Sequence, residues 1–186
     1  APQETIERAA DMLLAAKKPV ILMGNGSRSE ESWNLRIRLA ELLNATCFSS
    51  MKARAAFPTD HPLHPVHPFS NVPAQGKEIM TAGDVILSLD WIDFNGTLQQ
   101  LHKPTSSIAA KIINVTLDAS LHKGWSMDYF GLPPADLPVQ TSSDQFLAQI
   151  VPVLEKKLGG KPRWTGTNRV NPRPAEYGPN AAKQID

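Results

Sequence analysis

A short apolar run that leads directly into a glycine-rich turn is the feature that most constrains the fold of this chain. Residues 18–32 read KPVILMGNGSRSEES, so the apolar residues at 20–23 are followed at once by the glycines of 24–26. A short continuous apolar run is typical of a strand that is covered on both faces. Ser27 and Glu30 have the S-x-x-E spacing of a capping box. The stretch therefore predicts a buried strand, a tight turn and the start of a helix.

The segments around this stretch predict that helices and strands alternate. Apolar residues spaced at i, i+3, i+4 and i+7 predict a helix over about residues 4–17. A second helix, at about 29–43, is expected to bury Trp33, Ile37, Leu39, Ala40 and Leu43. Further helices are expected at about 73–82 and 143–158, and strands at 46–49, 85–89, 112–117 and 138–141. The alternation predicts an α/β fold whose parallel sheet has helices on both faces.

The composition is that of an ordinary globular protein and suggests no partner through charge. The 186 residues are 41% apolar and 20% charged, with a net charge of +1, which gives no electrostatic reason to expect nucleic acid or a membrane surface. Cys47 is the single cysteine, which excludes an intramolecular disulfide and a cysteine-based zinc site. No apolar run approaches the ~20 residues of a membrane span, and the N-terminus lacks a secretion signal. We expect a cytoplasmic protein. The first residue, an alanine, agrees with a fragment of a longer chain or with processing.

The last part of the chain differs in character from the rest. Residues 159–186 are rich in Gly, Pro and Asn and have no apolar period. This composition predicts a linker or an extended arm, although a plain disordered tail would have the same composition. We therefore divide the chain into a folded domain, residues 1–158, and an arm, residues 159–186.

The turn formed by Gly24, Asn25, Gly26 and Ser27 allows two interpretations. In the first, its backbone amides and the following helix start present themselves to a diphosphate. The dinucleotide fingerprint is G-x-G-x-x-G, however, and the position of its third glycine is occupied by Ser29. In the second interpretation, the turn is only the connection that the fold requires. The sequence of the turn alone favours this structural interpretation.

Three histidines follow the second predicted strand, and each of them precedes a proline. His61, His64 and His67 are three residues apart, and a polyproline II helix has ~3 residues per turn, so the imidazoles could share one side. Such a set would suit zinc or copper. Ligands one turn apart in this conformation are ~9 Å from each other, which is too far for a compact shell. We therefore interpret residues 57–69 as a proline-stiffened loop and expect no metal site.

Carboxylates follow several predicted strands or lie close to them, namely Asp84, Asp90, Asp93 and Asp118. At the carboxyl edge of a parallel sheet such groups can accept ribose hydroxyls, and they are also common helix caps. No order of His and Asp residues indicates a nucleophile, so we expect no catalytic residues in this chain.

Four segments, in order, resemble the central domain of thiamine-diphosphate-dependent enzymes, the family of acetolactate synthase, benzoylformate decarboxylase, pyruvate oxidase and oxalyl-CoA decarboxylase. They are AADMLLAAKKPVILMGNGSRSEES, LAELLNATCFSSMKARAAFPTDHPLHP, AGDVILSLDWID and KIINVTLDAS, within about residues 5–157. FPTDHP is similar to the family's Phe-Pro-x-Asp-His-Pro loop. The resemblance implies a Rossmann-like parallel sheet of about six strands, between an N-terminal pyrimidine-binding domain and a C-terminal diphosphate-binding domain.

The resemblance also implies that the chemistry belongs to a longer parent enzyme with thiamine diphosphate and Mg²⁺. The family's Gly-Asp-Gly…Asn-Asn cofactor motif and the glutamate segment of the pyrimidine domain do not occur in these residues. Because the cofactor carries the carbanion chemistry, a chain that cannot bind it cannot catalyse that chemistry. We expect a non-catalytic scaffold from a decarboxylase, synthase or lyase that acts on 2-keto acids or related substrates. The parent would be a homodimer or homotetramer, and residues 159–186 would cross to its diphosphate-binding domain.

In some relatives the central domain binds FAD or ADP at the carboxyl ends of the strands. Carried over by position, the candidate contacts are Gly24, Asn25, Gly26, Ser27, Asp90, Trp91 and Asp118. The chain lacks the glycine-rich loop and the Gly-x-Arg of flavin-binding members, and the missing arginine argues against retained flavin binding. Two alternatives stay open: a working FAD, ADP or coenzyme A module, and an independent domain like those of sirtuins or electron-transfer flavoproteins.

Overall fold

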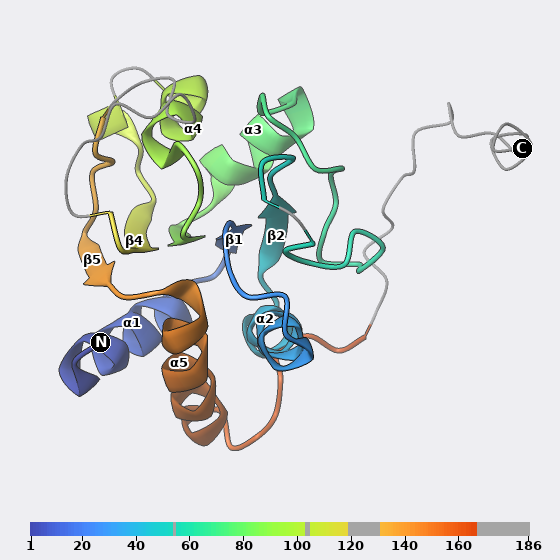
Figure 1. Ribbon diagram of the computed structural model, residues 1–186, viewed down its shortest axis with the longest axis vertical. Coiled ribbons are helices and arrows are strands. Elements are labelled where there is room, and N and C mark those ends of the chain that lie inside the picture. The colour runs from blue at the N-terminus through green and yellow to red at the C-terminus, as the bar shows by residue number, and fades with distance from the viewer. Residues whose placement is uncertain (54, 103–104, 119–130, 167–186) are drawn as a thin grey trace, which may run out of the picture.

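The computed structural model describes residues 1–53, 55–102, 105–118 and 131–166, which form one parallel sheet with helices on both faces (Figure 1). The sheet has the order β2-β1-β3-β4-β5, and all four pairs of neighbouring strands are parallel. Its strands are β1 (Pro19–Met23), β2 (Thr46–Ser49), β3 (Val85–Leu89), β4 (Lys111–Thr116) and β5 (Leu137–Gln140). The predicted α/β class with a parallel sheet is confirmed.

The helices divide between the two faces of the sheet. Their bounds are α1 (Gln3–Ala15), α2 (Glu30–Leu43), α3 (Ala74–Ala82), α4 (Phe94–Leu101), α5 (Ser143–Lys157) and the short 3₁₀ helix η1 (Thr105–Ser107). Figure 1 shows α1, α2 and α5 below the strands and α3 and α4 above them. The sequence predicted four of these helices but not α4, although Phe94, Leu98 and Leu101 recur in it at i, i+4 and i+7. Among the described residues no helix is both long and apolar enough to cross a membrane.

The central strand β1 explains why its sequence is continuously apolar. All five of its residues are buried. Ile21 and Met23 belong to the core beneath α1, α2 and α5, whereas Val20 and Leu22 belong to the core beneath α3 and α4. A strand whose successive side chains enter two different cores has no solvent face, so the polar half of the usual alternation is missing.

The sheet has five strands within the described residues, one fewer than the resemblance implied. Beyond β2 the chain runs along the sheet edge, where the Cys47 amide donates to the Leu63 carbonyl at 2.8 Å. Only an isolated parallel bridge between Ser50 and Phe69 forms there. Two prolines among residues 63–69 have no N–H to donate to a ladder, so this segment covers the edge without becoming a strand.

The start and the buried face of α2 differ from the prediction. The N-cap is Ser29, whose hydroxyl accepts from the Ser32 amide at 3.2 Å, while the Ser27 hydroxyl accepts from the Ser29 amide, so Ser27 and Glu30 form no capping box. The helix buries Leu39, Ala40 and Leu43 as expected, together with Ser32, Arg36 and Leu42. Trp33 and Ile37 are only half-buried. Two polar residues, Ser32 and Arg36, therefore occupy inward positions that the prediction did not assign to the core.

The first residues of the predicted arm pack against the domain. The Arg163 and Trp164 amides donate to the carbonyls of Leu42 and Glu41 at the end of α2, at 3.1 and 3.0 Å. The Arg163 guanidinium donates to the carbonyls of Leu14 and Ala16 at the end of α1, at 2.6 and 3.2 Å. These contacts satisfy carbonyls that a helix end leaves without intrahelical partners. Residues 167–186 of the arm lie outside the described residues.

Candidate functional site at the carboxyl edge of the sheet

The sequence-predicted site residues follow three neighbouring strands at the carboxyl edge of the sheet. From β1 the chain turns to one side to form β2 and then returns past β1 to form β3. This reversal of strand order lies between β1 and β3, where ligands bind in open α/β sheets. The turn that begins at Gly24 follows β1, Asp90 and Trp91 follow β3, and Asp118 comes two residues after β4.

The backbone closes the sheet edge directly after β1. The Gly24 amide donates to the Leu89 carbonyl and the Asn25 amide donates to the Asp90 carbonyl, both at 3.0 Å. A Cβ atom on Gly24 would lie 2.1 Å from the Asp90 carbonyl oxygen, so only glycine permits this approach. Two of the amides predicted to face a diphosphate therefore already have acceptors within the chain.

A carboxylate from α5 lies at the start of α2. Asp144 Oδ2 accepts from the Ser27 amide at 2.8 Å, and Asp144 Oδ1 accepts from the Ser32 hydroxyl. The Arg36 guanidinium forms an ion pair with the same carboxylate at 3.3 Å. The Ser27 amide, which was predicted to face a diphosphate, and the Ser32 hydroxyl therefore also have an acceptor within the chain.

Arg36 is the most deeply buried cation of this region. Its side chain is 4% exposed, and Nη2 donates to the Ser27 carbonyl at 2.9 Å and to the Ser32 hydroxyl at 3.0 Å. Burial lowers the pKa of Arg36, and the charge of Asp144 with its hydrogen bond opposes this shift. A Cβ on Gly26 would lie 2.1 Å from Nη2, so this second glycine makes room for the guanidinium.

Sequence reasoning missed both Arg36 and Asp144. A usable signal was present for the arginine, because Arg36 is spaced three, four and seven residues from Leu39, Ala40 and Leu43 and so shares their inward face. For Asp144 the sequence carries no such signal. A charged residue in the first turn of a helix is ordinarily interpreted as a favourable partner of the helix dipole.

Asp90, Thr116 and Asp118 come together at the ends of β3 and β4. The Thr116 hydroxyl donates to Asp90 Oδ1 at 2.9 Å and accepts from the Asp118 amide at 3.1 Å. Asp90 has a φ of 51°, in the left-handed region, which Asp tolerates better than most residues. Burial raises the pKa of the Asp90 carboxyl, and the Asp118 charge adds to this, while hydrogen bonds from Thr116 and Asn25 oppose it.

Trp91, predicted at the same edge, is largely a core residue. It is 7% exposed, and its indole Nε1 donates to the Thr97 hydroxyl at 2.7 Å. Its ring centroid lies 5.8 Å from that of Phe69. The indole therefore anchors the start of α4, and only part of its surface borders a small hollow next to Thr116 and Asp118.

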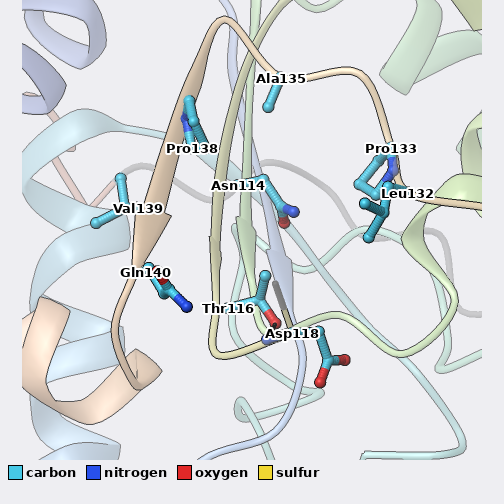
Figure 2. Close-up of a pocket in the computed structure, with 9 residues that line it drawn as sticks. All are labelled: Asn114, Thr116, Asp118, Leu132, Pro133, Ala135, Pro138, Val139 and Gln140. Atoms are coloured by element: carbon cyan, nitrogen blue, oxygen red, sulfur yellow. Dashed lines mark hydrogen bonds between the residues drawn. The ribbon is translucent and has the colours of Figure 1, made fainter. Parts of the chain in front are cut away.

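A pocket opens between the ends of β4 and β5. Its volume is about 270 Å³. Figure 2 shows the residues that line it, namely Asn114, Thr116, Asp118, Leu132, Pro133, Ala135, Pro138, Val139 and Gln140. The lining combines apolar side chains with amide, hydroxyl and carboxylate groups, which is the usual make-up of a small-molecule site. Of the predicted residues, only Asp118 lines this pocket.

The three histidines do not share one side as the polyproline interpretation allowed. His64 is fully buried, and its Nε2 lies 2.8 Å from the Ser49 hydroxyl, whereas His67 is exposed. His61 lies against Trp164, with ring centroids 5.0 Å apart, and its Nε2 is 3.5 Å from a Glu41 carboxylate oxygen. Within the described part of the chain, no group of three or more His, Cys, Asp or Glu residues is placed to hold a metal ion.

Ser49 and His64 form a serine–histidine pair, but their surroundings do not suit a nucleophile. Both residues are buried, at 3% and 0% exposure, so no substrate can reach the hydroxyl. Burial lowers the pKa of His64 to about 4. The imidazole is therefore neutral at neutral pH, and the pair fixes the loop of residues 57–69 against the end of β2.

Comparisons with known proteins identify what this chain is similar to. A family model described as "Thiamine pyrophosphate enzyme, central domain" matches residues 6–150. The chain is 36% identical over 87 residues to a sulfoacetaldehyde acetyltransferase from Roseovarius nubinhibens. That alignment covers 47% of this chain and 14% of the acetyltransferase.

Two solved structures share the fold. A thiamin diphosphate-dependent enzyme isolated from Mycobacterium smegmatis matches with a TM-score of 0.56 at 18% identity. The benzoylformate decarboxylase from Polynucleobacter necessarius matches with a TM-score of 0.51 at 20% identity. Each match covers 81% of this chain and 27% of the solved chain. The chain therefore spans about a quarter or less of the length of these relatives.

Proposed function

Because the chain belongs to the family of thiamine pyrophosphate enzyme central domains, we propose that it is a non-catalytic scaffold domain of a longer thiamine-diphosphate-dependent enzyme. The family match over residues 6–150 is the observation that carries this proposal. The short coverage of the relatives supports it, since 27% of a solved chain leaves room for further domains on either side.

In this proposal the parent enzyme is a decarboxylase, synthase or lyase that acts on 2-keto acids or related substrates. Thiamine diphosphate and Mg²⁺ are held by a pyrimidine-binding and a diphosphate-binding domain that flank this one. The parent is a cytoplasmic homodimer or homotetramer. The chain's own contribution is a rigid sheet that spaces the flanking domains, and residues 159–186 lead to the diphosphate-binding domain.

The surface of the carboxyl edge supports a scaffold role. The exposed large apolar side chains of the described residues are Met51, Leu117 and Leu132. Met51 comes two residues after β2, Leu117 directly follows β4, and Leu132 lines the pocket between β4 and β5. The three side chains belong to different parts of this edge, and burial of each against another domain would be favourable.

The test of this proposal compares the 186-residue chain with the longer protein that its gene encodes. We expect thiamine diphosphate and Mg²⁺ to leave the melting temperature of the 186-residue chain unchanged and to raise that of the longer protein, since only a protein that binds a ligand is stabilised by it. Turnover of a 2-keto acid should likewise require the longer protein. Cofactor-dependent turnover by the 186 residues alone, or a gene that encodes no flanking domains, would contradict the proposal.

The pocket between β4 and β5 favours a second candidate function, binding of a nucleotide such as ADP, FAD or coenzyme A through its nucleoside part. Asp118 and Thr116 offer oxygens for ribose hydroxyls, and Leu132, Pro133 and Pro138 offer an apolar wall for a base. Because the amides of Gly24 and Asn25 already have acceptors, this candidate assigns recognition to the nucleoside and not to the diphosphate.

Calorimetric titration with adenosine, ADP, FAD and coenzyme A tests the second candidate. Binding through the nucleoside predicts similar affinities for adenosine and ADP, and loss of both in Asp118→Asn. The matched control is Asp60→Asn, an exposed aspartate elsewhere, which should bind like the wild-type chain. Absence of heat with all four ligands would leave the scaffold role as the only candidate.

A further inference from the structure

Three donors from two neighbouring segments converge on one carboxylate at the start of α2. They are the Ser27 amide, the Ser32 hydroxyl and the Arg36 guanidinium, and the carboxylate belongs to Asp144 in the first turn of α5. The acceptor is 108 residues away in sequence from Arg36. The set is therefore assembled by the fold and not by a local turn motif.

Two independent features make this point attractive to an anion. The first is the amino end of α2, where the helix dipole favours negative charge. The second is the Arg36 side chain, which is 4% exposed and would be an uncompensated buried charge without a partner. The site consequently needs an anion whether or not a ligand is available.

Asp144 meets this need from within the chain. Its side chain is 35% exposed, so the carboxylate reaches the buried guanidinium from the surface side. The contact is backed by a second link between the same segments, in which the Ser143 hydroxyl donates to the Asn25 carbonyl at 2.6 Å. The first turn of α2 also carries Glu30 and Glu31, whose charges would repel a further anion.

We propose that Asp144 is the resident anion of the turn formed by residues 24–27 and that it excludes nucleotide diphosphates from this turn. A diphosphate that entered would have to displace the carboxylate and break the link between α2 and α5. Asp144 is thus a specificity-determining residue, one that fills the place of an anion with a carboxylate of the chain itself. This inference concerns the chain alone and does not depend on the presence of flanking domains.

The experiment removes the resident anion and offers a replacement to the full 186-residue chain. In Asp144→Ala, inorganic pyrophosphate should bind beside Arg36 and raise the melting temperature by about 3 to 6 °C at ten times its Kd. The wild-type chain should show no such shift at the same concentration, because its site is already filled. ADP should behave like pyrophosphate in the variant, whereas adenosine should have no effect through this site.

Three further variants make the result specific. Asp11→Ala removes an exposed carboxylate that pairs with Lys157, and pyrophosphate should not stabilise it. The double variant Asp144→Ala with Arg36→Met should lose the pyrophosphate response. Asp144→Asn keeps the shape of the side chain without its charge and serves if the alanine variant does not fold. An equal shift in the wild-type chain, or no shift in a folded Asp144 variant, would overturn the inference.

Discussion

The turn after β1 and the pocket between β4 and β5 lie at the same edge of one sheet, yet the chain closes the edge at the turn and leaves a space open at the pocket. In the turn, the amides of Gly24, Asn25 and Ser27 all donate to acceptors within the chain. At the pocket, Thr116 and Asp118 line an open space of about 270 Å³. A glycine-rich sequence after a strand thus indicates that two backbones approach closely. Such an approach can join two segments of the chain, as it does here, as readily as it can admit a ligand.

The comparison also shows that the two regions depend on different kinds of interaction. The turn is held by backbone pairing with β3 and by the contacts of Arg36 with Asp144. The pocket is bounded by side chains on strand ends and on residues 131–135, which can change without disturbing a ladder. We therefore expect substitutions in the turn to affect stability strongly and substitutions at the pocket to affect it weakly.

The largest effect is expected for Gly24→Ala. The added Cβ would lie 2.1 Å from the Asp90 carbonyl oxygen and 2.3 Å from its carbon, and backbone atoms cannot yield as a flexible side chain can. We expect a loss of about 3 to 5 kcal/mol in the free energy of unfolding, measured by urea denaturation.

Gly76→Ala is the matched control for Gly24→Ala. Gly76 lies within α3, and its added Cβ would meet only side-chain atoms, the nearest of them 3.3 Å away on Val72. Alanine also favours a helix, so this variant should stay within about 1 kcal/mol of the wild-type chain. Equal losses in the two variants would mean that the edge after β1 is not closed as described.

A somewhat smaller effect is expected for Arg36→Ala. The variant leaves the Ser27 and Ala56 carbonyls without their charged donor and opens a cavity between α2 and α5. We expect a loss of about 3 kcal/mol in the free energy of unfolding. Arg28→Ala, at an exposed position between the turn and α2, should change it by less than about 0.5 kcal/mol. Equal losses in the free energy of unfolding for Arg36→Ala and Arg28→Ala would contradict the role of the buried ion pair.

The strands of this sheet could be predicted closely, and the reason lies in their burial. The predicted segment 46–49 coincides with β2, and 85–89 coincides with β3. Both strands are buried at every residue. In β3 the largely apolar run VILSL carries the signal directly, whereas β2 (TCFS) has a polar residue at each end and was placed by its position after the second helix. The helix α4 was missed although Phe94 and Leu98 have helical spacing and pack in the core, because it is only 8 residues long and contains Gly96.

The candidate site was predictable only in part. The positions after β1, β3 and β4 were correct as places along one edge, because parallel strands bring their carboxyl ends together. Whether each polar group is bonded within the chain or faces a pocket was not predictable, because this depends on contacts between segments that are distant in sequence. Asp144 reaches Ser27 across 117 residues, and the sequence gives no means of pairing them. The same holds for His64, whose burial against Ser49 decides that it is neutral.

At the pocket, Thr116→Val should have a moderate effect. The substitution keeps the shape of the side chain and removes the hydroxyl that donates to Asp90 and accepts from the Asp118 amide. We expect a loss of about 1 kcal/mol in the free energy of unfolding. Because the hydroxyl opposes the upward shift in the pKa of Asp90, its removal should raise that pKa further, which NMR titration of the carboxyl would measure. An unchanged pKa of Asp90 in Thr116→Val would mean that the Thr116 hydroxyl does not stabilise the Asp90 carboxylate.

The smallest effect, and the one with a pH signature, is expected for Asp90→Asn. Burial and the Asp118 charge raise the pKa of Asp90, so the folded state disfavours the carboxylate more than the unfolded state does. The resulting penalty is fully present above the folded-state pKa and disappears below the ordinary value of 3.8. Asparagine removes the charge, tolerates the left-handed φ of 51° and can still accept from Thr116.

Asp90→Asn should therefore be slightly more stable than the wild-type chain at pH 7, by less than about 1 kcal/mol because the side chain is half-exposed and solvent screens its charge. The difference should shrink as the pH falls and vanish near pH 3, measured by urea denaturation across this range. Asp60→Asn, at an exposed position, should show no such trend. A destabilised Asp90→Asn at neutral pH would mean that the Asp90 carboxylate has a charged partner at this edge, as the Asp144 carboxylate has in Arg36.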